Sequence, residues 1–286
     1  MRLTTISKLV VLPNTLFGLP WLVINICLAF LDPLMPAKHL TFGLAFWIFL
    51  AFLSARVAGM SFNRLIDVAY DAKNPRTQDR GLVTGELTKQ QVLGLAWGAI
   101  GVFFIACGAI NKVCLLLAPV AVAILWGYSY LKRVTPWYHL IMALNHALLP
   151  IFVWAALTGG ITVVAVYLAL AVLMLISSND IIYGIQDVEF DREHGLHSMA
   201  TAIGPQTSVW LARAFQALFI TLLVDVAALL GMPSTFYFGI AFVSVILICL
   251  NLQLDISDPR TINRYMFCNN TWTGFVLMAF TLMSVL

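Results

Sequence analysis

Charged side chains are scarce in this chain of 286 residues. Asp, Glu, Lys and Arg supply only 10% of the residues, 61% are hydrophobic, and the mean hydropathy is +0.93. In soluble domains roughly a quarter of the residues are charged. The composition therefore excludes an ordinary soluble protein. It predicts an integral membrane protein with a single domain over residues 1–286, surrounded by membrane lipid.

Other signals are missing as well. The five cysteines lie singly, without CxxC or Cys/His metal spacing, which argues against a metal–thiolate site. The net charge is only +3, and basic loops facing anionic lipid account for it, so no nucleic-acid partner is implied. No A-x-A-like cleavage site follows the first apolar stretch, so we expect a retained helix there.

Apolar segments long enough to cross about 30 Å of hydrocarbon as helices recur along the chain. We expect an all-α membrane fold with nine spans, at residues 10–31, 41–62, 92–110, 113–131, 137–158, 161–182, 206–231, 235–254 and 266–286.

The Lys and Arg residues predict the orientation of these spans. With the N-terminus inside, twelve of them fall on the cytoplasmic side and two, Lys38 and Lys112, on the opposite side. This is a strong positive-inside pattern. We therefore expect a cytoplasmic N-terminus and cytoplasmic polar loops, in the inner (plasma) membrane of a bacterium.

Two polar clusters lie where spans end, and in both of them aspartates stand four residues apart. The clusters are Asn63, Asp67 and Asp71 after the second span, and Asp180, Tyr183, Asp187 and Asp191 at the end of the sixth. Four-residue spacing places side chains on one helical face, about 5–6 Å apart. Stacked carboxylates near a membrane repel each other unless a cation lies between them.

Oxygen ligands without Cys or a well-placed His suit Mg²⁺, which commonly bridges to phosphate oxygens. Basic residues near both clusters support this interpretation. Arg76 and Arg80 follow the first cluster, and Tyr128, Lys132 and Arg133 end the fourth span. A diphosphate bound by Mg²⁺ and by Lys and Arg is a good leaving group.

Three ordered motifs resemble those of the UbiA superfamily of intramembrane prenyltransferases, in its 4-hydroxybenzoate polyprenyltransferase-like branch. NxxxDxxxD stands at residues 63–71, and DxxYxxxDxxxD stands at 180–191, followed by Gly195 and Ser198 as GxxS. The YSxxKRxT motif stands at residues 128–135. The resemblance covers the whole chain.

This resemblance implies helices around a central cavity and transfer of a polyprenyl group from polyprenyl diphosphate to a hydroxylated aromatic carboxylic acid in ubiquinone or menaquinone biosynthesis. It implies a catalytic role for Asp67, Asp71, Asp187 and Asp191, which with Asn63 would bind Mg²⁺. It implies substrate binding by Arg56, Asn63, Arg76, Arg80, Tyr128, Lys132, Arg133, Asp180 and Tyr183.

Arg56 bears on the acceptor, because it lies about two helical turns deeper in the span than Asn63. The aromatic-prenylating members resemble this chain in having an Arg at this offset, which could hold the carboxylate of an aromatic acid. Either 4-hydroxybenzoate or 1,4-dihydroxy-6-naphthoate, the latter on the futalosine route to menaquinone, fits this interpretation.

The chain departs from the family at Val83, where a Pro is usual, and we expect a less rigid loop there. Asn145, His146 and Asp225 receive no role.

Paired acids would also suit an ion-coupled transporter. Their position at span ends, followed by Arg and Lys, favours the enzyme.

Overall fold

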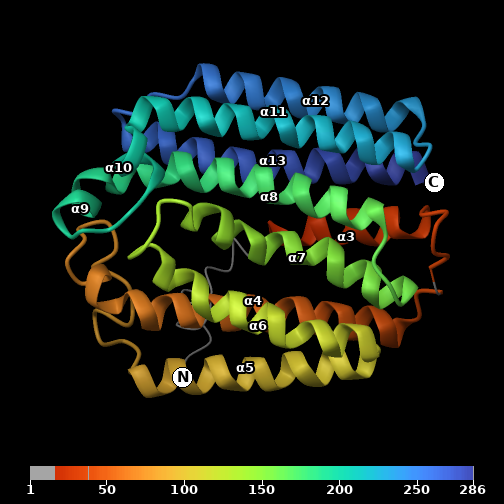
Figure 1. Cartoon of the computed structure of the whole chain (residues 1–286), viewed down its shortest axis with the longest axis horizontal. Helices are drawn as coiled ribbons and strands as arrows, with labels where there is room; N and C mark the ends of the chain where they lie inside the picture. The colour runs from red at the N-terminus through yellow and green to blue at the C-terminus, as the bar shows by residue number, and fades with distance from the viewer. Residues whose placement is uncertain (1–16, 38, 286) are drawn as a thin grey trace. The chain divides into compact units, whose positions relative to one another are not determined.

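The computed structural model describes residues 17–37 and 39–285, and within them the chain is helical, without a strand. The first seven residues of the expected span 10–31, and the predicted outside residue Lys38, lie outside the described residues. The helices are α3 (Gly18–Phe30), α4 (Phe42–Asp71), α5 (Lys89–Ile110), α6 (Lys112–Leu131), α7 (Tyr138–Thr158), α8 (Val163–Gly184), the 3₁₀ turn η1 (Ile185–Asp187), α9 (Val188–Glu193), α10 (Met199–Ile203), α11 (Pro205–Leu229), α12 (Ser234–Leu252) and α13 (Pro259–Val285) (Figure 1).

Each expected span coincides with one of these helices. In the described part of the chain, seven helical segments are long and apolar enough to cross a membrane: α4, α5, α6, α7, α8 continuing through α9, α11 and α12. The described part of α3 is shorter, at 13 residues, and α13 is long but more polar. The all-α membrane fold is confirmed, seven of the nine spans meet these criteria, and the central cavity stays a prediction.

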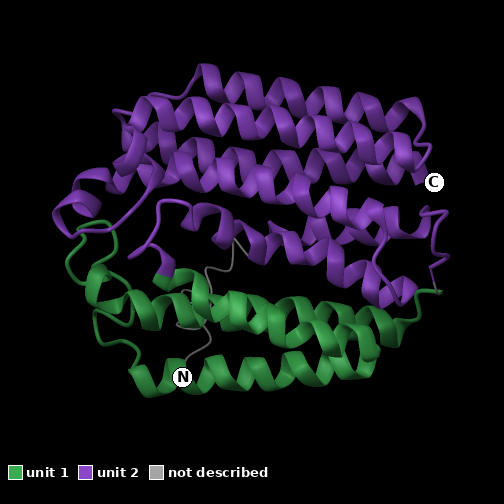
Figure 2. Ribbon diagram, in the orientation of Figure 1, with its two compact units in different colours: residues 1–16, 39–130 green, residues 17–38, 131–286 purple. Residues whose placement is uncertain are grey.

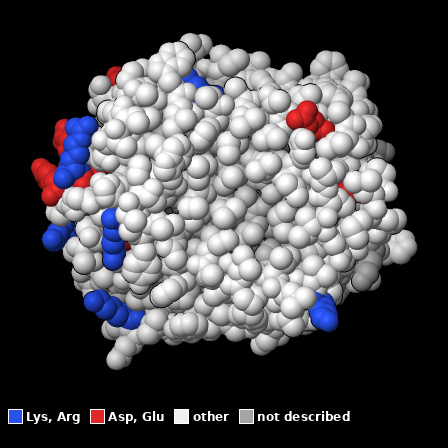
Figure 3. Space-filling model, viewed as in Figure 1, with Lys and Arg blue, Asp and Glu red and all other residues white. Residues whose placement is uncertain are grey.

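The surface agrees with a lipid environment. Large apolar side chains are widely exposed, among them Phe42 at 90%, Leu116 at 66% and Phe238 at 66%. The face drawn in Figure 3 shows few Lys, Arg, Asp or Glu side chains. Such broad apolar exposure is unusual in a soluble monomer and is expected where lipid covers the protein.

The described chain divides into two compact units, of residues 39–130 and of residues 17–37 with 131–285 (Figure 2). The chain passes from the first to the second in the last turn of α6. The expected single domain over 1–286 stays a prediction.

The first unit contains α4, α5 and α6. Phe62 and Ala58 of α4 pack against Ala96 and Ile100 of α5. Gly59 allows α6 to come close, because a Cβ there would lie 2.8 Å from Leu125 Cδ2. This close approach fixes α4 against α6 one turn before Asn63.

The second unit is organised around α8, which packs between α7 and α11 (Figure 1). Thr162 caps α8 by accepting a hydrogen bond from the backbone N of Ala165. Gly159 ends α7 at φ 79°, a left-handed conformation that favours glycine. The polar end of α8, the turn η1 and the segment α9 carry the second acidic motif.

Candidate active site

The first acidic motif lies on one continuous helix, as its spacing predicts. Asn63, Asp67 and Asp71 all belong to α4. Asn63 Nδ2 donates to Asp67 Oδ2 at 2.7 Å and to Ser129 Oγ of α6 at 3.2 Å. Because these two bonds use both amide hydrogens, the Oδ1 atom of Asn63 is left as an acceptor.

The loop after α4 returns Arg80 to the end of this helix. Arg80 Nη1 donates to both carboxylate oxygens of Asp71, at 2.6 and 2.7 Å. Two further bonds shape the loop, from Thr77 Oγ1 to the Asp71 carbonyl and from the Arg76 backbone N to Asn74 Oδ1. Arg80 was predicted to contact a diphosphate, and in the structure it is the partner of a motif acid.

Val83 stands where the family usually has Pro, and the structure gives its backbone N–H a partner. That N–H donates to the carbonyl of Arg80 at 2.8 Å, and the same carbonyl accepts from Thr84 N at 3.0 Å. A proline could not make the first bond. The loop is therefore closed by hydrogen bonds where the sequence led us to expect only a loss of rigidity.

Arg56 and Tyr128 also belong to the first unit. Arg56 is half-buried in the middle of α4. Tyr128 of α6 lies close enough to Arg56, Arg64 and Asp67 for their charges to affect the ionisation of its phenol. The structure thus connects the predicted acceptor residue, Arg56, with the phenol of the YSxxKRxT motif.

The second acidic motif does not lie on one regular helix, because a 3₁₀ turn interrupts it. Asp180 belongs to α8, Asp187 is the last residue of η1, and Asp191 belongs to α9. The three 3₁₀ residues turn the chain by about 60° more than three α-helical residues do. Asp187 and Asp191 are both buried, at 6% and 0% exposure, whereas the Asp180 side chain is 22% exposed.

Lys132 forms an ion pair with the buried Asp191, with Nζ 2.8 Å from Oδ1. Its backbone carbonyl accepts from His197 N at 2.8 Å, which joins the α6–α7 connection to the α9–α10 connection. The chain reverses after α9 at Gly195, where φ is 64°. The GxxS motif thus has a physical basis, because Gly195 permits the reversal and Ser198 caps α10.

Asp180 has a partner that sequence reasoning missed. His139 Nδ1 lies 2.7 Å from Asp180 Oδ2, and the buried ring of His139 also contacts the start of α10. Forty-one positions separate the two residues, so no local spacing indicates the contact. Ser129, which holds Asn63, was missed for the same reason.

Tyr183 and Arg133 were also predicted to bind substrate. Tyr183 is half-buried and packs against an apolar cluster that includes Ile182 and Met199. Arg133 lies in the turn after α6 and is half-buried. Of the residues without a predicted role, Asn145 donates to the Met142 carbonyl at 3.1 Å within α7.

The donor set fits Mg²⁺ as a hard cation. Within the described residues no group of three or more His, Cys, Asp or Glu side chains is close enough to hold a metal by itself. Mg²⁺ does not require one, since it is usually held by one or two carboxylates, several waters and substrate phosphates. The acceptor oxygen of Asn63 beside Asp67, and the buried carboxylates of Asp187 and Asp191, are ligands of the right kind.

Comparison with known proteins identifies the family. Residues 20–273 match the model of the UbiA prenyltransferase family. The chain belongs to the UbiA prenyltransferase family. It is therefore a prenyltransferase enzyme, and the alternative of an ion-coupled transporter is set aside.

Relatives of this UbiA protein include the 4-hydroxybenzoate octaprenyltransferase of Pseudoalteromonas atlantica. The two are 27% identical over 222 residues, which cover 78% of this chain and 77% of the relative. The apo structure of a UbiA homolog from Aeropyrum pernix K1 has a TM-score of 0.83 and 24% identity, and the match covers 95% of this chain and 98% of that one. A UbiA homolog from Archaeoglobus fulgidus bound to GPP and Mg²⁺ has a TM-score of 0.70 and 16% identity, with 98% and 99% covered. The two structural matches show that the fold of these UbiA homologs covers nearly the whole chain.

Proposed function

We propose that this enzyme transfers a polyprenyl group from polyprenyl diphosphate to a hydroxylated aromatic carboxylic acid of the 4-hydroxybenzoate type, in quinone biosynthesis. The observation that carries the proposal is that each acidic motif has a basic partner at its end, Arg80 on Asp71 and Lys132 on Asp191. Acids that can bind a cation thus stand beside cations that can bind phosphate. The name of the Pseudoalteromonas relative supports the acceptor, and the GPP and Mg²⁺ of the Archaeoglobus homolog support the donor.

Asn63, Asp67, Asp71, Asp187 and Asp191 would hold Mg²⁺. When bound, this metal neutralises charge on the diphosphate and improves it as a leaving group.

Arg80 and Lys132 would contribute donors to the departing diphosphate oxygens, where charge-assisted hydrogen bonds are strong. The allylic C–O bond breaks and its electron pair leaves with the diphosphate. A ring carbon of the acceptor then forms a C–C bond to the prenyl group, and the ring loses a proton. Apolar helices around the reacting groups keep water away from the allylic cation.

Arg56 would bind the carboxylate of the acceptor. An Arg within a membrane-spanning helix is costly unless it has a function there, and its planar guanidinium matches a carboxylate. The same anchor would suit 1,4-dihydroxy-6-naphthoate, which also carries a carboxylate. We propose 4-hydroxybenzoate first, because the Pseudoalteromonas relative named above and other relatives of the chain carry that substrate in their names.

The positive-inside pattern supports cytoplasmic active-site loops in a bacterial inner membrane. Reporter fusions after Leu82 and after Gly160 would test this orientation. We expect a cytoplasmic signal from the first and an external signal from the second.

The test of function is a transfer assay in membranes that contain the protein. A labelled polyprenyl diphosphate is supplied with either 4-hydroxybenzoate or 1,4-dihydroxy-6-naphthoate, and the lipid-soluble product is identified by mass spectrometry. We expect product with the first acid and Mg²⁺. If only the naphthoate gives product, the naphthoate is the acceptor in place of 4-hydroxybenzoate. If neither acid gives product, the proposal is contradicted.

A further inference from the structure

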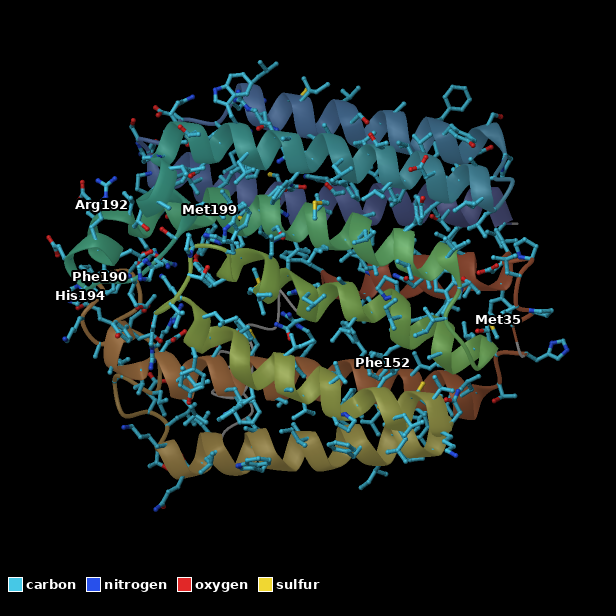
Figure 4. All side chains as sticks on the ribbon, in the orientation of Figure 1. Met35, Phe152, Phe190, Arg192, His194 and Met199 are labelled. Atoms are coloured by element: carbon cyan, nitrogen blue, oxygen red, sulfur yellow. The ribbon has the colours of Figure 1, made fainter. Side chains whose placement is uncertain are left out.

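His139 connects three elements of the second unit. It is the second residue of α7, its side chain is buried at 1% exposure, and its ring nitrogens reach α8 and α10. Nδ1 lies 2.7 Å from Asp180 Oδ2, and Nε2 accepts a hydrogen bond from the backbone N–H of Met199 at 3.3 Å. Figure 4 labels Met199 at the start of α10.

These two contacts define the tautomer of the imidazole. Because Nε2 accepts from a backbone N–H, its lone pair is occupied and the ring proton is on Nδ1. Nδ1 is then the donor to Asp180. A backbone group, which cannot rotate away, thus orients the histidine, and the histidine orients the aspartate.

Two further neighbours restrict the ring. Tyr138 lies against it with ring centroids 4.0 Å apart and planes tilted by 33°. On α8, a Cβ at Gly184 would lie 3.2 Å from His139 Cε1. Gly184, one turn after Asp180, therefore allows the ring to come close enough for the hydrogen bond.

Asp180 is held by one oxygen only. His139 takes Oδ2, and among the described residues Oδ1 has no hydrogen-bond partner. The Asp180 side chain is 22% exposed, whereas His139 is covered. A partly exposed carboxylate that is fixed through one oxygen can present the other oxygen to a substrate in a single orientation.

We propose that His139 is a positioning residue for prenyl transfer, which fixes Asp180 Oδ2 so that Oδ1 faces the substrate. The proposal rests on the proposed function, in which Asp180 binds substrate. His139 itself does not touch substrate. Its loss releases the Asp180 carboxylate to other rotamers, and small losses of orientation reduce rates steeply.

The experiment compares variants that differ in one hydrogen bond. His139→Phe keeps the ring and removes both nitrogens, whereas His139→Asn keeps an N–H near the position of Nδ1. Gly184→Ala displaces the ring without changing a polar group. His194→Phe is the matched control, because its ring stacks on Phe190 at 4.1 Å and its Nδ1 bonds a backbone carbonyl and no motif acid (Figure 4).

Steady-state kinetics with each substrate varied in turn give the first readout. We expect His139→Phe to lower kcat/KM by about 10- to 100-fold. The loss should concern the same substrate, and the same one of kcat and KM, as the loss in Asp180→Asn. His139→Asn should recover most of the loss, Gly184→Ala should show a smaller loss of the same kind, and His194→Phe should match the wild type. The His139→Phe/Asp180→Asn double variant should be no slower than Asp180→Asn alone, because both act through one carboxylate.

Three results would overturn the proposal: wild-type kinetics for His139→Phe or for Asp180→Asn, equal losses for His139→Asn and His139→Phe, or additive losses in the double variant. Thermal unfolding in detergent shows whether a variant has a folding defect. The milder variants His139→Asn and Gly184→Ala test the contact if His139→Phe does not fold.

A second readout does not depend on activity. In ¹⁵N-histidine-labelled protein, the signals assigned by their loss in His139→Asn should show the Nδ1–H tautomer, and Asp180→Leu should reduce it. An inactive wild type would refute the proposed function while these spectra still test the contact. An Nε2–H tautomer in the wild type would refute the inference alone.

Discussion

Arg80 holds Asp71 through a single nitrogen. Nη1 donates to both carboxylate oxygens, at 2.6 and 2.7 Å, and the Arg80 side chain is 25% exposed. Among the described residues, Nε and Nη2 of Arg80 make no hydrogen bond. One guanidinium can therefore hold the last aspartate of the first motif and still offer donors to a phosphate.

Substitution of Arg80 should separate these two roles. Arg80→Lys can keep the contact with Asp71 but lacks the additional planar donors, so we expect kcat/KM for the prenyl diphosphate to fall about 10-fold. Arg80→Ala should lower it about 100-fold, because a charge-assisted partner is removed. Arg260→Ala is the control, since the Arg260 side chain is 91% exposed and, within the described residues, its ion pair is with Asp258. Equal activity of Arg80→Ala and the control would contradict this role.

The backbone bond of Val83 gives a prediction about the loop. Val83→Pro removes the N–H that bonds the Arg80 carbonyl at 2.8 Å. Since a hydrogen bond contributes about 1 kcal/mol net, we expect a loss of about fivefold in kcat/KM for the diphosphate. Val83→Ala keeps the N–H and should behave as the wild type. If Val83→Pro were as active as Val83→Ala, the bond would have no part in holding Arg80.

The sequence was sufficient for the elements and for the first motif. Apolar length located the long helices but not the short α9 and α10, and the four-residue spacing of Asn63, Asp67 and Asp71 is realised because α4 is regular to its last residue. It was not sufficient for the second motif, where η1 interrupts the helix between Asp180 and Asp191. No periodic pattern encodes such a break, which depends on packing.

The partners of the motif acids could be predicted only in part. Lys132 was expected near the second motif as a phosphate ligand, but its ion pair with Asp191 joins residues far apart in the chain. The contact of His139 with Asp180 is of the same kind. Such contacts follow from how α7, α10 and the α6–α7 connection lie against the second motif, and neither spacing nor composition predicts that arrangement.

Lys132 is expected to stabilise the fold as well as bind phosphate. Asp191 is fully buried, so Lys132→Met leaves a buried carboxylate without its cation and should lower the free energy of unfolding by about 3 kcal/mol. The Lys132→Met/Asp191→Asn double variant should recover much of this loss, although it stays inactive. Thermal unfolding in detergent measures the stability of the single and the double variant. A double variant less stable than Lys132→Met would show that the pair is not the cause.

Arg56 should affect only the acceptor. Arg56→Ala is expected to raise the KM of the aromatic acid and lower kcat, a loss of about 30- to 1000-fold in kcat/KM, with little change in diphosphate binding. An acceptor analogue without the carboxylate is the control, because the variant and the wild type should use it equally. A loss that is the same for both acceptors would assign Arg56 to the fold or to the diphosphate.

The central claim is that both acidic motifs carry Mg²⁺-dependent prenyl transfer to an aromatic acid. The most direct measurement is formation of prenylated 4-hydroxybenzoate by membranes containing the wild type, Asp67→Ala or Asp187→Ala, with Mg²⁺, with a chelator, and with Mg²⁺ restored. We predict product only for the wild type with Mg²⁺, recovery when Mg²⁺ returns, and losses of several orders of magnitude in both variants while they still insert in the membrane. Undiminished transfer by either variant, or by the wild type in the chelator, would contradict the account.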